Sequence, residues 1–245
     1  MNILLSNDDG YMAMGLKALD AILSEAGHKI SVAAPDSEQS GKSHSFTITG
    51  RMRAVEYAPG HYHFSGTPVD CIIYSHRCSL FQEMPDIVIS GINHGYNLST
   101  DIIYSGTCAA ARQAALYGMK AIAVSLESGA PSYMFGAAAE FIRDNLPSFA
   151  AAIPEYSFMN VNIPASFNGE WRLSGIGVSS YSDTIIIAED NGSEKILAMA
   201  DSEITRGGDA GDYPVDSDVC SSGMASVSIV KCFPEIDERG MGLLS

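Results

Sequence analysis

Two adjacent carboxylates, Asp8 and Asp9, follow a short apolar run close to the amino terminus. If that run is the first strand of a parallel sheet, the two acids lie in the loop at its carboxyl end, where α/β proteins place functional groups. Neighbouring side chains of an extended strand point to opposite faces, so both acids can bind one ion only if the chain turns there. Gly10 permits such a turn. These residues alone leave two interpretations open, a metal site and a solvated turn.

A second polar segment, at 90–107, contains amides, hydroxyls and a glycine that could contact an anion: Asn93, Asn97, Ser105, Gly106 and Thr107. Its last three residues precede an alanine-rich stretch that we expect to be helical. Backbone N–H groups and hydroxyls at a helix N-terminus form a binding site for phosphate. Serine and threonine are also the preferred helix caps whatever the function. The residues themselves therefore allow either a phosphate site or an ordinary cap.

The segments around these motifs alternate between strand and helix patterns through the first two thirds of the chain, which indicates β-α-β units and a parallel sheet. We expect strands at 2–6, 29–34, 46–48, 52–57, 62–64, 87–90 and 121–126. We expect helices around Leu16–Leu23, ending before Gly27, and at 68–78, 107–117 and 134–145. Thr67, Pro68 and Asp70 supply the N-cap, N1 and N3 residues of the second helix. After Pro154, Asn-Gly turns predict a hairpin-rich extension with strands at 158–163, 171–178, 184–188 and 195–199.

Composition narrows the classes of function. The 245 residues, 46% of them hydrophobic, suffice for one α/β domain with appendages. The net charge of −15 comes without a cluster of lysine and arginine, which argues against DNA or structured RNA as a partner. With no leader-like segment and no membrane-length apolar run, we expect a cytoplasmic protein that does not contact membranes. Five cysteines without a CxxC spacing argue against a disulfide framework or a zinc ribbon.

Other motifs of nucleotide and phosphate chemistry fit poorly. The first strand–helix turn lacks GxGxxG and carries two acids where a dinucleotide pyrophosphate would lie. The triplet Gly41-Lys42-Ser43 is similar to the end of a P-loop, but the position that must be glycine holds Asp36. There is no GxSxG nucleophile motif. A haloacid-dehalogenase phosphatase would need its two acids separated by one residue, whereas these are adjacent.

Taken together, the loops resemble the SurE family, the stationary-phase survival proteins, which are metal-dependent nucleotide phosphatases. The matching stretches are NILLSNDDG (2–10), APDSEQSG (34–41), GTPVDC (66–71), PDIVISGINHGYNL (85–98), IYSGTCAAA (103–111), AIAVSL (121–126) and NVNIP (160–164). The resemblance implies one α/β domain. It would have a Rossmann-like three-layer core with a mainly parallel sheet over about 1–165, and a β-hairpin extension over about 166–245. The extension would make homodimer or homotetramer contacts. The resemblance also implies one divalent cation per subunit, held by Asp8, Asp9, Ser40 and Asn93.

On this basis we expect a phosphomonoesterase that hydrolyses 5′- or 3′-nucleoside monophosphates to nucleoside and phosphate. Oxygen ligands favour Mg²⁺ or Mn²⁺ over zinc. Either Asp8 or Asp9 would accept the proton of the attacking water. The phosphoryl oxygens would be held by Asn97, Ser105, Gly106 and Thr107. Two alternatives remain: a phosphatase for other small phosphates or short polyphosphate, and a non-catalytic nucleotide sensor on the same fold.

The chain also departs from the family pattern. Ser37 stands where arginine is usual, Lys42 where small or apolar residues are frequent, and 177–183 replaces a basic, glycine-containing stretch. By sequence position, Lys42 and Arg112 are the basic side chains expected near the site. These departures leave the expected metal ligands intact and the substrate preference open.

Overall fold

The computed structural model describes residues 1–78, 80, 81 and 83–234. Within these residues, one sheet contains β1 (Asn2–Ser6), β2 (Lys29–Pro35), β3 (Ala54–Ala58), β4 (His61–Phe64), β5 (Ile87–His94), β6 (Lys120–Leu126), β7 (Ser157–Ile163), β8 (Trp171–Leu173) and β11 (Ala225–Lys231). The strand order is β3-β4-β2-β1-β5-β6-β7-β11-β8. The six central strands from β4 to β7 pair in parallel, while β3 and β11 pair antiparallel with β4 and β7. The predicted α/β class with a mainly parallel sheet is confirmed.

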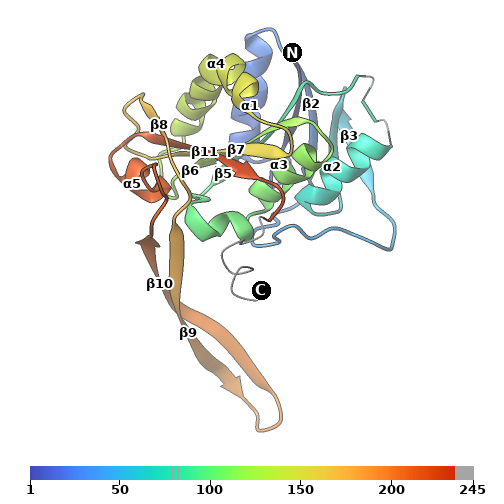
Figure 1. Cartoon of the computed structure of the whole chain (residues 1–245). Helices are drawn as coiled ribbons and strands as arrows, with labels where there is room; N and C mark the ends of the chain where they lie inside the picture. The colour runs from blue at the N-terminus through green and yellow to red at the C-terminus, as the bar shows by residue number, and fades with distance from the viewer. Residues whose placement is uncertain (79, 82, 235–245) are drawn as a thin grey trace, which may run out of the picture.

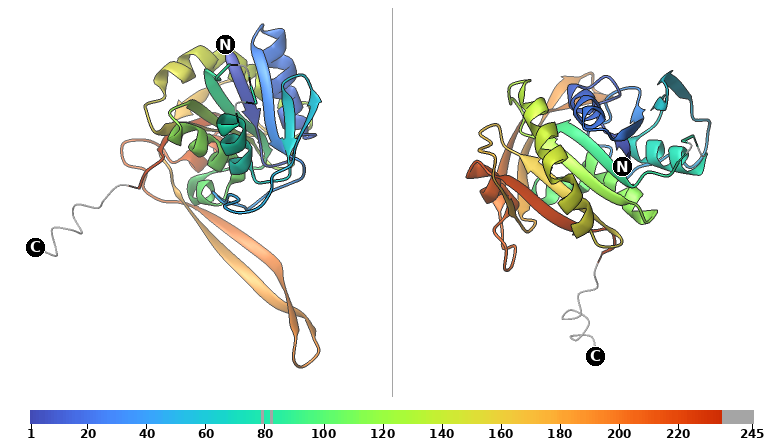
Figure 2. Two further views of the ribbon diagram at one scale, coloured as in Figure 1. Left: turned by 90° about the vertical axis from the view of Figure 1, so that its right-hand side faces the viewer. Right: turned by 90° about the horizontal axis from the view of Figure 1, so that it is seen from above.

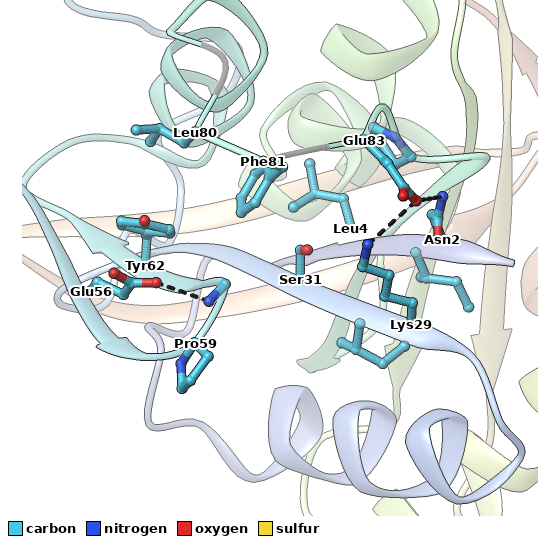
Figure 3. Close-up of a pocket in the computed structure, with 14 residues that line it drawn as sticks. Asn2, Leu4, Lys29, Ser31, Glu56, Pro59, Tyr62, Leu80, Phe81 and Glu83 are labelled. Atoms are coloured by element: carbon cyan, nitrogen blue, oxygen red, sulfur yellow. Dashed lines mark hydrogen bonds and ion pairs between the residues drawn. The ribbon is translucent and has the colours of Figure 1, made fainter.

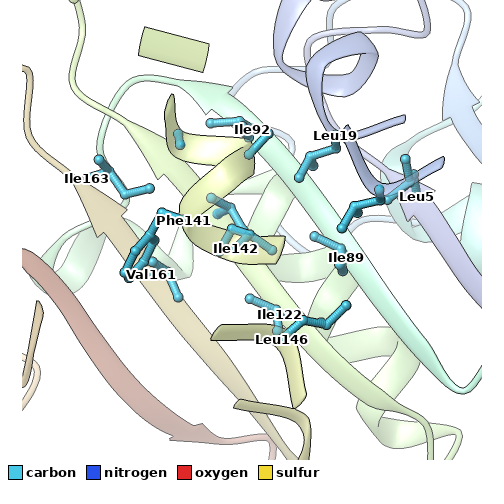
Figure 4. Close-up of a cluster of buried hydrophobic side chains, with 14 of the residues drawn as sticks. Leu5, Leu19, Ile89, Ile92, Ile122, Phe141, Ile142, Leu146, Val161 and Ile163 are labelled. Atoms are coloured by element: carbon cyan, nitrogen blue, oxygen red, sulfur yellow. The ribbon is translucent and has the colours of Figure 1, made fainter. Parts of the chain in front are cut away.

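Helices cover both faces of the sheet and make three layers (Figures 1 and 2). Side chains of β1 alternate between the two faces, with Ile3 and Leu5 in one buried cluster and Leu4 in the other. The first cluster, shown in Figure 4, packs beneath α1 (Met14–Glu25) and α4 (Met134–Ala152). The second packs beneath α2 (Pro68–Arg77) and α3 (Gly106–Leu116), whose alanines allow close approach to the sheet.

The predicted start of α2 is confirmed in detail. The Asp70 N–H donates to Thr67 Oγ1 at 3.1 Å and the Thr67 N–H donates to Asp70 Oδ2 at 3.0 Å, which forms a capping box. The Asp70 carboxylate also accepts the backbone N–H of Thr47 at 2.8 Å. That N–H is therefore used by a side chain rather than by a sheet, and the strand expected at 46–48 does not form.

The last helix of the core is longer than its sequence predicts. α4 continues past Asn145 to Ala152 and contains Pro147. Leu146 and Phe149 are buried in the first cluster, so packing holds the final turns although the proline removes one backbone donor. No helix in the described part of the chain has both the length and the apolar composition to cross a bilayer.

The last third of the chain differs most from expectation. The strand expected at 171–178 is two strands, because β8 ends at Leu173 and β9 (Val178–Asp190) begins in a separate sheet. β9 pairs with β10 (Lys195–Gly207) in a long hairpin that projects from the body in Figures 1 and 2. Neither α5 (Asp216–Ser221) nor β11 was predicted. Because β11 lies between β7 and β8, the core sheet extends past residue 165, where the extension was expected to begin.

Candidate functional site

The candidate site lies where the strand order reverses. From β1 the chain runs to β2 on one side, and it later returns to β5 on the other side of β1. Ligands of open α/β sheets bind in the crevice at such a point, beyond the carboxyl ends of the strands. A cavity of about 510 Å³ opens there. Its wall contains Asp8, Ser40, Gly41, Asn93, His94, Gly95, Tyr96, Asn97, Asp101, Tyr104, Ser105, Glu127, Ser128, Tyr181, Ile204 and Arg206.

A tight turn after β1 presents the two acids. The Asn7 side chain donates from Nδ2 to the Gly10 carbonyl at 2.8 Å. Gly10 itself has φ +94°, in the region that glycine adopts readily. The Gln39 N–H donates to the Asp8 carbonyl at 2.7 Å, which ties this turn to the loop after β2. The turn that the sequence predicted from Gly10 is therefore present.

Asp8 is buried against the beginning of α3, with 4% of its surface exposed. Its Oδ2 accepts the backbone N–H of Thr107 at 3.1 Å, and its Oδ1 accepts the Thr107 hydroxyl. Gly106 allows this approach, because a Cβ there would lie 2.8 Å from the Asp8 Cβ and 2.9 Å from Oδ2. The helix N-terminus thus orients a carboxylate of the chain itself, rather than leaving all its donors for an external anion.

The pKa values of both acids are raised, chiefly by burial. Burial raises the pKa of Asp8, although the hydrogen bonds from Thr107 oppose that change. Burial and the neighbouring Asp8 charge raise the pKa of Asp9 to about 6. One Asp9 oxygen, Oδ2, accepts the backbone N–H of His94 at 3.2 Å, which connects the β1 turn to the end of β5. Two carboxylates held this close at a sheet edge favour a compensating positive charge.

Neutral oxygen donors complete the set on the same wall. The Ser40 hydroxyl donates to Glu38 at 2.9 Å, and its lone pairs stay available to a cation. The Asn93 Nδ2 donates to the Gly95 carbonyl at 2.8 Å, which leaves the amide oxygen as the group for a ligand. Asp8, Ser40 and Asn93 line one cavity, and Asp9 directly follows Asp8.

This donor set fits a hard divalent cation. Two carboxylates, a hydroxyl and an amide supply only oxygen, which suits Mg²⁺ or Mn²⁺. Asp8 is buried and Asp9 is half-buried beside it, and two adjacent carboxylates in such a place are stabilised by a bound cation. Within the described residues, no three His, Cys, Asp or Glu side chains gather into a further metal-binding group.

Only two of the four residues expected to hold phosphate lie on the cavity wall. Ser105 lines the cavity, and its hydroxyl also caps α3 by accepting the Cys108 N–H at 3.0 Å. Thr107 is fully buried behind Asp8 and is not part of the cavity wall. Asn97 lines the cavity while its Nδ2 donates to Ser125 Oγ at 2.7 Å. The structure therefore brings Asn97 and Ser105 to the cavity, and Gly106 and Thr107 to Asp8.

Several cavity residues were not singled out from the sequence. His94 and Tyr104 belong to the polar segment 90–107, which the sequence had already indicated as a candidate for the site. Tyr181 and Arg206 come from the hairpin, far from the other motifs along the chain. The two basic residues expected near the site, Lys42 and Arg112, do not line the cavity. The Arg112 guanidinium lies over the Phe158 ring instead.

A second cavity, of about 410 Å³, lies elsewhere, between β1, β2, β4 and the segment around Phe81 (Figure 3). Its charged groups are largely paired: Lys29 lies 3.3 Å from Glu83, and Glu56 accepts the Gly60 N–H at 3.0 Å. None of the predicted site residues lines it. Of the two acids of the β1 turn, Asp8 lines the other cavity, and neither lines this one.

Comparisons with known proteins identify the family of this chain. The family model described as survival protein SurE matches residues 3–184. A protein of Anaeromyxobacter sp. (strain K) named 5′-nucleotidase SurE is 41% identical over 192 residues, 78% of this chain and 74% of its own. One of the same name from Treponema pallidum is 44% identical over 167 residues, 66% and 89% of the two chains. The crystal structure of the SurE protein from Aquifex aeolicus has a TM-score of 0.82 at 29% identity, covering 100% of this chain and 98% of that one. The chain belongs to the SurE family.

Proposed function

We propose that this protein is a divalent-cation-dependent phosphomonoesterase that hydrolyses nucleoside monophosphates, 5′-monophosphates in particular. The observation that carries the proposal is the wall shared by Asp8, Ser40, Asn93 and Ser105 at the reversal of strand order. Relatives at 41–44% identity named 5′-nucleotidase support the reaction class.

A Mg²⁺ or Mn²⁺ ion at Asp8, Asp9, Ser40 and Asn93 would polarise a phosphoryl oxygen and acidify the attacking water. Asp8 accepts two hydrogen bonds from Thr107, which fix its orientation. Asp9 accepts one from His94 and keeps more acceptor capacity, so Asp9 is the better placed of the two to take the water's proton. The Ser105 hydroxyl and the Asn97 amide, both on the wall, supply donors for the phosphoryl oxygens.

The cavity also suits the nucleoside part of the substrate. Tyr96, Tyr104 and Tyr181 line it, and aromatic rings stack on any nucleobase. Tyr104 is 58% exposed, so its ring is accessible to a ligand. An aromatic wall next to an oxygen-rich metal site favours nucleotides over inorganic polyphosphate.

A turnover panel tests the proposal. Purified protein, stripped with EDTA and then supplied with Mg²⁺ or Mn²⁺, is given 5′- and 3′-nucleoside monophosphates, simple phosphate esters and tripolyphosphate. We expect phosphate release from 5′-monophosphates that stops in EDTA and returns with metal. Tight nucleotide binding without phosphate release in any metal would instead identify a sensor, and preference for tripolyphosphate would identify a polyphosphatase.

We further propose that the hairpin β9–β10 pairs with a second copy of this chain, giving a homodimer or a homotetramer. Its exposed apolar side chains include Ile185, Ile186, Ile187, Ile196, Leu197 and Met199. Three consecutive isoleucines place apolar groups on both faces of the ribbon, and an isolated two-stranded hairpin is marginally stable in water. An exposed apolar surface of this kind is typical of an interaction site.

Sedimentation equilibrium over a range of protein concentrations tests the pairing. Ile186→Lys should lower the measured mass towards one chain, because it places a charge in the proposed contact. Ile48→Lys is the matched control, since Ile48 is 83% exposed and lies outside the hairpin. A wild-type protein that stays monomeric, or an Ile186→Lys variant with the wild-type mass, would contradict the proposal.

A further inference from the structure

The hairpin contributes a cation to the cavity. Tyr181 of β9 and Ile204 and Arg206 of β10 line the wall. Ile204 lies opposite Tyr181 in the hairpin register, and Arg206, two residues on, projects from the same face. Of the described residues on this wall, Arg206 is the only lysine or arginine, whereas the acids are Asp8, Asp101 and Glu127.

Arg206 is held in place by Asp101, but not all of its hydrogen-bond donors have a partner. Its Nη2 donates to Asp101 Oδ2 at 3.2 Å, and the Tyr181 hydroxyl donates to the other oxygen of the same carboxylate. The Arg206 Nε is buried and has no hydrogen-bond partner among the described residues. A buried donor without a partner costs on the order of 1–3 kcal/mol. The Arg206 side chain as a whole is 28% exposed and lies on the cavity wall, so its guanidinium has donors beyond the one that contacts Asp101 to offer an anion there.

Asp101 links this group to the start of α3. It lies in the short 3₁₀ segment η1 (Ser99–Ile103), and its carbonyl accepts the Ser105 N–H at 3.1 Å. The base of the hairpin is fixed to the same segment, because Thr100 Oγ1 donates to the Ser179 carbonyl at 2.9 Å and accepts the Ser179 N–H at 3.1 Å. The position of Arg206 is thus coupled to the Ser105 side of the cavity.

The charges around the cavity indicate that Arg206 would attract a phosphate group. A phosphomonoester carries a charge of about −1.5 to −2 at pH 7. Asp8 and Asp9 would neutralise a divalent cation, while Asp101 and Glu127 repel an anion. Arginine presents a planar fork of donors that matches phosphate oxygens.

We propose that Arg206 is a substrate-binding residue that donates hydrogen bonds to the phosphate of the nucleoside monophosphate, and that Asp101 and Tyr181 position it. The inference rests on the proposed nucleotidase function. The family match ends at residue 184, so it covers neither Arg206 nor the strand that carries it. On this account the hairpin is part of the substrate site.

The test compares Arg206→Ala and Arg206→Lys with Lys195→Ala. Lys195 pairs with Asp190 at the far end of the same strand, eleven residues away, or about 36 Å at about 3.3 Å per residue. Its loss changes the net charge equally. The measurements are steady-state turnover of adenosine 5′-monophosphate with Mn²⁺, and calorimetric binding of inorganic phosphate and of Mn²⁺.

We expect Arg206→Ala to raise KM and to lower kcat/KM at least about tenfold. Inorganic phosphate should bind more weakly to Arg206→Ala than to the wild type, whereas Mn²⁺ should bind to both with the same affinity. For kcat/KM and phosphate affinity, Arg206→Lys should lie between the wild type and Arg206→Ala, because lysine keeps the charge but lacks the planar pair of donors. Lys195→Ala should match the wild type. Wild-type phosphate affinity and kcat/KM in both Arg206 variants would overturn the proposal. If the wild type binds phosphate through Arg206 yet releases none from any nucleotide, the reaction is refuted and the anion site stands.

A double-mutant cycle tests the positioning role. Asp101→Asn keeps the size of the side chain and should lower kcat/KM in the wild type but not in Arg206→Ala, because its effect acts through the guanidinium. An equal loss in both backgrounds would show that Asp101 acts independently of Arg206 and would refute that role.

Discussion

Thr107→Val separates two roles for the start of α3. Thr107 is fully buried, and its hydroxyl donates to Asp8 Oδ1. Valine has nearly the same shape, so the change removes the hydroxyl and keeps the backbone N–H. A hydrogen bond to a charged group contributes about 1.5–3 kcal/mol. For a chain of this size the melting temperature should fall by about 3–12 °C. Because the hydroxyl orients a proposed metal ligand, Mn²⁺ affinity should fall by about 10–100-fold.

Thr107→Ser is the matched control. It keeps the hydroxyl and loses one methyl group, worth about 0.8 kcal/mol, so it should retain near-wild-type Mn²⁺ affinity. Calorimetric Mn²⁺ titration, thermal unfolding and phosphate inhibition are measured on both variants. If Thr107→Val keeps its Mn²⁺ affinity and only phosphate inhibition weakens, Thr107 contacts substrate and the support of Asp8 is refuted.

Two further predictions concern packing and pH. Gly106→Ala should destabilise the protein by about 1–3 kcal/mol and reduce turnover, because its Cβ would meet Asp8. Gly136→Ala, where a Cβ meets nothing within 4 Å, should leave turnover unchanged; equal turnover losses would contradict this. The hydrogen bond to Asp20 raises the pKa of His61, so the stability that His61 contributes is full below its unfolded pKa and is lost as pH rises through the folded value. Thermal unfolding of His61→Gln should therefore show a larger deficit near pH 5.5 than near pH 8.5, and a deficit that grows with pH would refute the pairing.

The parts of the site that could be predicted from the sequence depend on local signals. Asp8, Asp9 and Gly10 adjoin one strand, and the α2 capping box lies within four residues. The parts that could not be predicted depend on contacts between distant residues. Arg206 meets Asp101 across 105 positions and Tyr181 meets it across 80, with no local pattern to indicate either contact.

Some elements of the fold also depend on contacts between distant residues. β11 joins the sheet by pairing with β7, 64 to 74 residues earlier in the chain, and its serines interrupt the apolar run typical of a central strand. Thr107 shows that a local signal does not identify the partner of a side chain. It does lie at a helix N-terminus, but the group it binds is Asp8, 99 residues away.

The central claim is that Asp8 and Asp9 hold the cation on which turnover depends. Its most direct test is calorimetric titration of EDTA-stripped protein with Mn²⁺, alongside turnover of adenosine 5′-monophosphate. The proteins compared are the wild type, Asp8→Asn, Asp9→Asn and the control Asp190→Asn, an acid of the hairpin that pairs with Lys195. We predict one Mn²⁺ per wild-type and control chain, and a loss of more than about 100-fold in affinity, with loss of turnover, in each site variant. Wild-type affinity and turnover in either site variant would contradict the account.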